Sequence, residues 1–96
     1  MYLDFDKVIT KKVREGERVY LKTKIKAKKA IQFLVNSPSV IAYVARTQKC
    51  EVVSTECYDK IFNSHNPSIY EPKADMDLNL MVEALDTTEF TITLIE

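Results

Sequence analysis

The residues of this chain that could do chemistry are two cysteines, a single histidine and two closely spaced aspartates. Cys50, Cys57 and His65 are separated by seven and eight positions, unlike the short paired spacings of typical zinc ligands. Cys57 could serve as a nucleophile with His65 as its base, but neither residue is flanked by a helix terminus or a glycine-lined stretch that would activate it. We therefore expect no metal site and no catalytic cysteine, and we interpret His65 as a solvated loop residue.

The carboxylate pair Asp75 and Asp77 would share one face of an extended strand. Two such groups could act as a general acid and base or bind a cation. An acidic edge exposed to water is the more common arrangement, and it is our interpretation here. Together with the cysteine and histidine spacings, this predicts a protein that is not an enzyme and has no cofactor.

The two cysteines leave two redox states open. At a separation of seven positions, Cys50 and Cys57 would point to opposite faces of a strand. On a helix they would lie about 10 Å apart, beyond disulfide reach. A disulfide therefore requires a chain reversal between them, which the Ser-Thr-Glu segment 54–56 could supply. The sequence favours two free, partly buried thiols in a reducing compartment and keeps the disulfide as the alternative.

The strongest pattern of the chain is the segment 19–28, which reads V-Y-L-K-T-K-I-K-A-K. Its period of two predicts a strand with one apolar face and one solvated basic face. Lysines on the basic face would recur about every 6.6 Å, close to the spacing of phosphates in single-stranded nucleic acid, and a tyrosine beside them could stack on a base. The members of this candidate polyanion site are Tyr20, Lys22, Lys24, Lys26 and Lys28.

Exposed lysines on a strand also protect against edge-to-edge aggregation. We prefer that interpretation, because RNA-binding sheets usually display two or more aromatic residues among their cations. The chain has no net charge, yet residues 7–29 carry ten Lys or Arg against two Glu, and residues 47–96 carry three Lys against ten Asp or Glu. Pairing of early strands with late ones would neutralise these charges within the molecule. A polyanion site or self-association of opposite faces is the alternative.

The elements that must position these residues are short alternating segments bounded by turns. We expect strands at 8–13, 19–28, 31–35, 40–45, 51–54, 77–85 and 90–94, a hairpin turn at 14–17 around the only glycine, and an irregular connection over 58–73. The apolar segment 40–45 is expected to be covered on both faces. One domain over residues 1–96 is predicted, an all-β, small antiparallel β-sandwich of jelly-roll type with six to eight strands. The alternative is an α+β fold with one short helix near 27–36.

The order of these segments resembles two families of compact β-sandwich. The charged turn Glu15-Gly16-Glu17 precedes a long strand, F-L-V-N-S-P-S-V at 33–40 leads to Tyr43-Val44, and L-M-V-E-A-L at 80–85 leads to F-T-I-T-L at 90–94. This order is similar to that of GOLD-type sandwiches and bacterial pre-peptidase C-terminal domains, and it spans most of residues 8–95. The chain departs from them at 75–77, where Asp-Met-Asp replaces a glycine and an aromatic. The resemblance implies a non-catalytic module for protein or ligand contact.

We therefore predict a structural or protein-interaction module, part of a larger assembly, with a protein partner or self-association as its mode of contact. Nucleic-acid or polyanion binding by the basic strand is the alternative. No apolar run is long enough to cross a membrane, and the N-terminus lacks the features of a signal peptide. These observations favour a cytoplasmic location.

Overall fold

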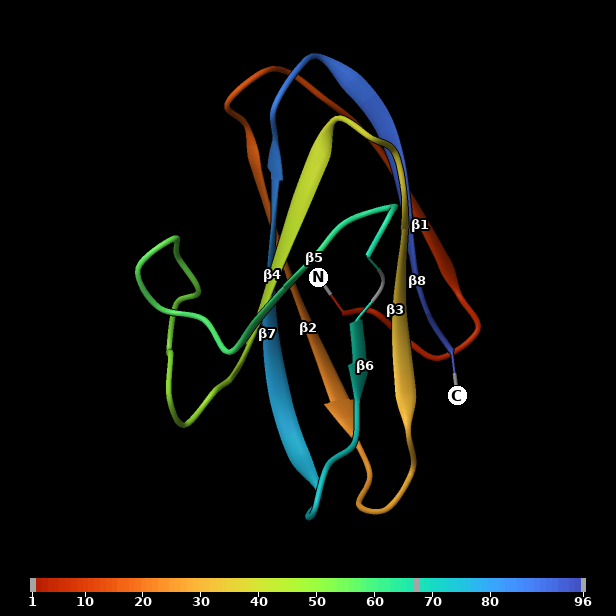
Figure 1. The fold of residues 1–96 in the computed structure, drawn as a ribbon, viewed down its shortest axis with the longest axis vertical. Helices are drawn as coiled ribbons and strands as arrows, with labels where there is room; N and C mark the ends of the chain where they lie inside the picture. Colours follow the sequence, from red (N-terminus) through yellow and green to blue (C-terminus); the bar gives the residue numbers. More distant parts are fainter. Residues whose placement is uncertain (1, 67, 96) are drawn as a thin grey trace.

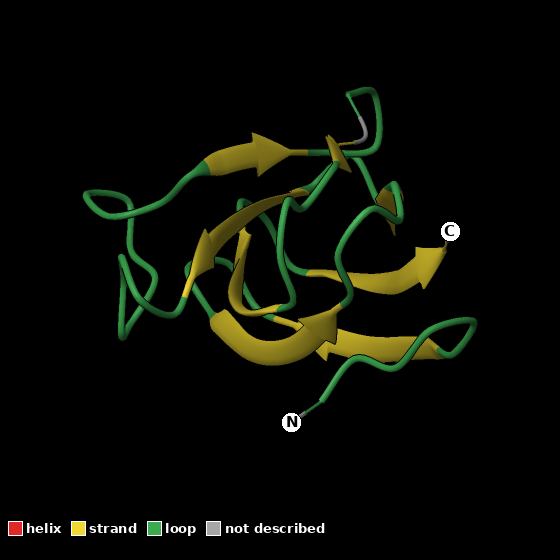
Figure 2. Ribbon diagram, turned by 90° about the horizontal axis from the view of Figure 1, so that it is seen from below, coloured by secondary structure: helices red, strands yellow, loops and turns green. Residues whose placement is uncertain are grey.

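The computed structural model describes residues 2–66 and 68–95, which form two four-stranded antiparallel sheets (Figure 1). This confirms the predicted all-β sandwich. Figure 2, turned by 90° from Figure 1, shows only strands and loops in the described residues. The short helix considered near 27–36 is wrong, since most of that segment is a strand. No helix in the described part of the chain could cross a membrane. The strands are β1 (Val8–Val13), β2 (Arg18–Ile25), β3 (Ile31–Asn36), β4 (Val40–Arg46), β5 (Lys60–Phe62), β6 (Ser68–Tyr70), β7 (Met76–Ala84) and β8 (Thr88–Ile95).

One sheet has the order β1-β8-β3-β6 and the other has the order β2-β7-β4-β5. In Figure 1, β1, β8 and β3 lie toward the right and β2, β7 and β4 toward the left. Every connection between successive strands crosses from one sheet to the other, except the connection from β4 to β5. The hairpin expected around Gly16 is therefore wrong, because β1 pairs with β8 and β2 pairs with β7. Gly16 adopts a φ of +83° at this crossing, a conformation that favours glycine.

The core lies between the inner faces of the two sheets. The predicted inward face is confirmed in β7, where positions 78, 80, 82 and 84 belong to this core, and in β8, where positions 90, 92 and 94 do. Phe33 of β3 stacks on Phe62 of β5 with ring centroids 5.3 Å apart, which joins the two sheets through the edge strand β5. Each fully buried side chain of this size contributes about 1.5–3 kcal/mol relative to exposure.

Short segments close the two open sides of the sandwich. On one side the backbone N–H of Leu3 donates to the carbonyl of Lys22 at 2.8 Å, and the hydroxyl of Thr23 donates to the carbonyl of Leu3 at 2.8 Å. Leu3 is 1% exposed and belongs to the core. On the other side the Lys60 ammonium of β5 donates to the Ile69 carbonyl of β6 at 2.9 Å. Residues 58–73, predicted to be irregular, thus contain two short strands.

The uneven charge of the sequence is partly balanced across the strand pairs. The register places Arg18 opposite Glu83, with Nε and Oε2 2.9 Å apart. It also places Lys24 opposite Asp77, and Lys12 of β1 opposite Glu89 of β8. Internal neutralisation of early by late strands is therefore present in the fold, as the charge distribution predicts.

Candidate functional site

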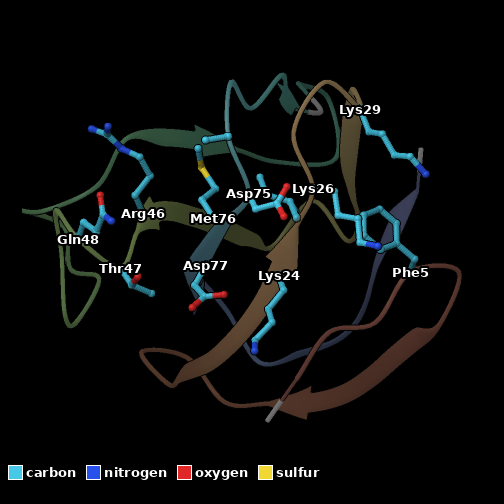
Figure 3. Close-up of a pocket in the computed structure, with 12 residues that line it drawn as sticks. Phe5, Lys24, Lys26, Lys29, Arg46, Thr47, Gln48, Asp75, Met76 and Asp77 are labelled. Carbon is cyan, nitrogen blue, oxygen red and sulfur yellow. The ribbon is translucent and has the colours of Figure 1, made fainter.

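A cavity of about 690 Å³ opens at one end of the sandwich (Figure 3). Four segments build it: the chain before β1, the end of β2 with the turn that follows, the end of β4, and the start of β7. Its charged lining consists of Lys24, Lys26, Lys29, Arg46, Asp75 and Asp77. Its apolar lining includes Phe5, Ile25 and Met76, of which Phe5 and Met76 are partly buried against the main core.

The structure divides the predicted basic strand face into two groups. β2 ends at Ile25, so the single row of lysines expected through position 28 is wrong. Lys24 and Lys26 line the cavity, whereas Lys22 lies opposite Asn79 on the sheet. Lys28 belongs to the turn, with a φ of +65°, and lines a separate depression.

Tyr20 also lies outside the cavity, on the exposed face of β2. The cavity instead brings Lys24 and Lys26 together with Asp75 and Asp77, which were considered as a separate group in the sequence. Lys24 and Asp77 extend side by side from neighbouring strands in Figure 3.

The carboxylates of the cavity already have structural roles. Oδ1 of Asp75 accepts a hydrogen bond of 2.8 Å from the backbone N–H of Ala27, which ties the turn after β2 to the start of β7. Asp77 faces Lys24 across the strand pair. Within the described part of the chain, Lys24 and Lys26 make no side-chain hydrogen bond or ion pair. The cavity is therefore suited to bind an anionic group beside an apolar one.

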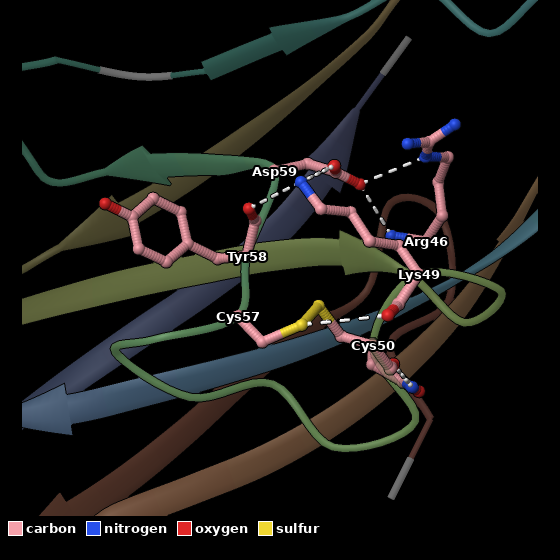
Figure 4. Close-up of polar contacts among 7 residues, drawn as sticks. Arg46, Lys49, Cys50, Cys57, Tyr58 and Asp59 are labelled. Carbon is pink, nitrogen blue, oxygen red and sulfur yellow. Dashed lines mark hydrogen bonds and ion pairs between the residues drawn. A yellow bond between two sulfur atoms is a disulfide. The ribbon is translucent and has the colours of Figure 1, made fainter.

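A second feature is the loop between β4 and β5, which projects at the left of Figure 1. Cys50 and Cys57 are joined in a disulfide with their Cα atoms 6.0 Å apart (Figure 4). The required chain reversal is present, because the backbones of Ser54 and Cys57 exchange hydrogen bonds of 3.1 and 3.2 Å. The favoured expectation of two free thiols is wrong. The segment 51–54, predicted to be a strand, is part of this loop.

The loop packs on the outer face of the β2-β7-β4-β5 sheet and forms a second small core. Val53 and Cys50 of the loop are buried against Tyr43, Ala45 and Met81 of the sheet. This explains why β4 is covered on both faces, as its apolar sequence predicts.

Polar side chains anchor the same loop to the sheet. The amide of Asn79 donates to the carbonyls of Cys50 and Glu51, each at 3.1 Å. Because a buried amide without partners is costly, these bonds fix the position of the loop on the sheet.

Asp59 anchors the end of the loop (Figure 4). Its carboxylate accepts hydrogen bonds from the backbone N–H and from Nε of Arg46, at 2.9 and 3.2 Å, and pairs with the Lys49 ammonium at 3.0 Å. Burial alone would raise the pKa of Asp59, but these donors and positive charges outweigh it and hold the pKa below its usual value.

Comparison with known proteins identifies the architecture. No protein-family model matches the chain, and no curated protein matches it in sequence. The crystal structure of the pre-peptidase C-terminal domain of a collagenase from Bacillus anthracis superimposes with a TM-score of 0.68, covering 97% of this chain and 91% of that chain. The chain has the fold of a pre-peptidase C-terminal domain. This confirms the resemblance to pre-peptidase C-terminal domains that was drawn from the order of the segments. At 10% sequence identity the likeness concerns the fold and assigns no role to any residue.

The roles of two residues of β7 that contact the loop between β4 and β5 were missed from the sequence. Asn79 and Met81 point outward from β7, and an outward methionine was the available sign that something covers that face.

The other candidate residues are not brought together. His65, interpreted from the sequence as a solvated loop residue, is exposed in the loop after β5, and Cys57 is held in the disulfide.

Proposed function

We propose that this chain is a non-catalytic module that contacts another protein as part of a larger protein or assembly. The domain of similar fold was solved as the C-terminal domain of a larger protein, a collagenase, which supports a module role. The observation that carries the proposal is the apolar surface on the outer face of the β2-β7-β4-β5 sheet. Its exposed members are Tyr20 at 50%, Ile61 at 46% and, on the loop, Val52 at 66% exposure.

The strand register arranges this surface as a row. Tyr20 of β2 lies opposite Met81 of β7, which lies opposite Tyr43 of β4, which lies opposite Ile61 of β5. The loop covers the central pair, and the tyrosine and isoleucine at the ends stay exposed. They contribute nothing to the main core. Exposed aromatic and aliphatic side chains gathered on one face are typical of contact surfaces.

A photo-crosslinking amino acid placed at Tyr20 or Ile61 tests the proposal. Val8 is the matched control, because it is 64% exposed but lies on the other sheet. In extracts of the source cells, we expect crosslinked products from the first two positions and none from the control. The same reaction with the purified chain alone separates self-association from binding of a different protein. Equal crosslinking at all three positions contradicts a dedicated surface.

A second candidate function, polyanion binding, is favoured by the four cations that line the cavity, Lys24, Lys26, Lys29 and Arg46. Fluorescence anisotropy of labelled single- and double-stranded oligonucleotides, titrated across salt concentration, tests it. Micromolar binding that weakens steeply with salt would support a phosphate-binding surface. Absence of binding at low salt would remove this candidate.

The sequence favoured a cytoplasmic location, but the disulfide supports a different, oxidising compartment. Disulfides persist in oxidising environments and are rare where thiols are kept reduced. Alkylation of free thiols in protein taken directly from its source, followed by mass spectrometry, distinguishes the two states. Unlabelled Cys50 and Cys57 support the oxidising compartment, and labelled ones support the cytoplasm.

A further inference from the structure

We infer that the cavity at the end of the sandwich binds an acidic segment of a partner protein, with a carboxylate held by Lys24 and Lys26 and a neighbouring apolar side chain placed on Phe5 and Met76. This inference rests on the proposed function as a protein-contact module and names a second, separate surface for it. It assigns a partner chemistry to the residues that line the cavity.

The charge balance of the cavity favours an anionic group. Of the cations that line it, Arg46 is already paired with Asp59, whereas Lys24 and Lys26 make no ion pair within the described residues, and both lining carboxylates have neighbours within the fold. Asp75 accepts the N–H of Ala27, and Asp77 lies opposite Lys24. Lys26 has no such opposing acid in the described residues, and it enters the cavity from the turn after β2. A carboxylate placed between Lys24 and Lys26 would therefore gain charge-assisted hydrogen bonds without displacing an existing ion pair.

The apolar part of the lining favours a peptide over a polyphosphate. Phe5 and Met76 are partly buried, and each presents apolar surface to the cavity. A volume of about 690 Å³ accommodates several side chains of a bound segment. A nucleic acid would instead need a continuous basic track, yet Lys22 and Lys28 lie outside the cavity. Asp75 and Asp77 would also repel successive phosphates.

The probe for a first test is a fluorescein-labelled peptide of alternating glutamate and leucine, compared with the same peptide carrying glutamine in place of glutamate. The cavity variant is Lys24→Gln with Lys26→Gln. The control variant is Lys22→Gln with Lys28→Gln, which changes the net charge equally. All four lysines are exposed, so both variants are expected to fold, and thermal unfolding confirms this.

Fluorescence anisotropy at moderate salt then measures binding. We expect the cavity variant to weaken binding of the glutamate peptide at least tenfold, the control variant to weaken it less than twofold, and the glutamine peptide not to bind. Met76→Ala is expected to weaken binding of the leucine-containing peptide several-fold more than that of an alternating glutamate–serine peptide.

Three results would overturn the inference. Equal weakening by both lysine pairs would indicate attraction by net charge alone. Failure of the glutamate peptide to bind would remove the acidic partner. Binding of an oligonucleotide, but not of the peptide, with loss in the cavity variant would assign the site to nucleic acid. None of these results changes the crosslinking expected at Tyr20 and Ile61, so failure of the cavity and failure of the proposed function are distinguishable.

Discussion

The Cys50–Cys57 disulfide closes a small loop on the outer face of a sheet, and reduction provides a quantitative test of how that loop is held. The two cysteines are seven positions apart, so the closed loop contains eight residues. In the chain-entropy model, a loop of that size lowers the entropy of the unfolded chain by about 8 cal/mol/K, equivalent to about 2.5 kcal/mol at 25 °C. Reduction keeps both sulfur atoms in place, so it changes this term with little change in packing.

The free energy of unfolding is measured by urea denaturation, followed by circular dichroism, with and without a phosphine reductant. We expect reduction to lower the free energy of unfolding by about 2.5 kcal/mol, with a fall in melting temperature of about 10–20 °C for a domain of this length. The native circular dichroism spectrum should be unchanged, because Val53 and the Asn79 amide still hold the loop on the sheet.

A double variant, Cys50→Ala with Cys57→Ala, supplies the control. It is expected to lose at least as much stability as reduction removes, and the reductant should then have no further effect. An oxidised protein whose unfolding free energy is the same with and without the reductant would refute the reasoning. It would show that the bridge is either absent in solution or offset by strain in the folded state.

Three further predictions concern single residues. Asn79→Ala leaves the carbonyls of Cys50 and Glu51 without their donor and is expected to cost about 1–3 kcal/mol in urea denaturation; a loss no larger than that of a typical surface substitution would contradict the anchoring role. Because Asp59 has a lowered pKa, its contribution is present above the usual value of 3.8 and is lost as the pH falls through the folded-state pKa. Asp59→Asn should therefore make the free energy of unfolding less dependent on pH below about 4. The same pH dependence in the variant and the original protein would contradict this. Gly16→Ala at a φ of +83° is expected to cost about 1 kcal/mol, although an added Cβ meets no atom within 4 Å; a neutral effect would indicate that the turn relaxes.

The alternation of the sequence predicts which face of each strand is buried. Leu78, Leu80 and Val82 share a period of two and all lie in the core, because only that spacing buries one face of an extended strand. The burial of β4 on both faces follows from its nearly continuous run of apolar residues. Burial is therefore predictable wherever the pattern is local to one strand.

Pairing is not predictable in the same way. A turn such as that around Gly16 can join neighbours in one sheet or cross to the other, and the turn residues are of the same type in both cases. The alternating lysines continue past Ile25, but the strand ends there because Asp75, from a distant segment, takes the N–H of Ala27. The cavity depends on that long-range contact, so only its separate charged groups were visible in the sequence.

The order of strands within the two sheets also has a consequence for biosynthesis. The inner strands β7 and β8 follow the other strands of this domain in the sequence, and they supply partners to β1, β3, β2 and β4. In a nascent chain in which β7 and β8 have not yet been made, the native strand pairs that can form are β4 with β5 and β3 with β6. Until β7 and β8 have been made, β1 and β2 lack the neighbouring strands with which they pair in the two sheets. We expect the charge of the lysines at 11, 12, 22 and 24 on these strands to oppose aggregation of such intermediates.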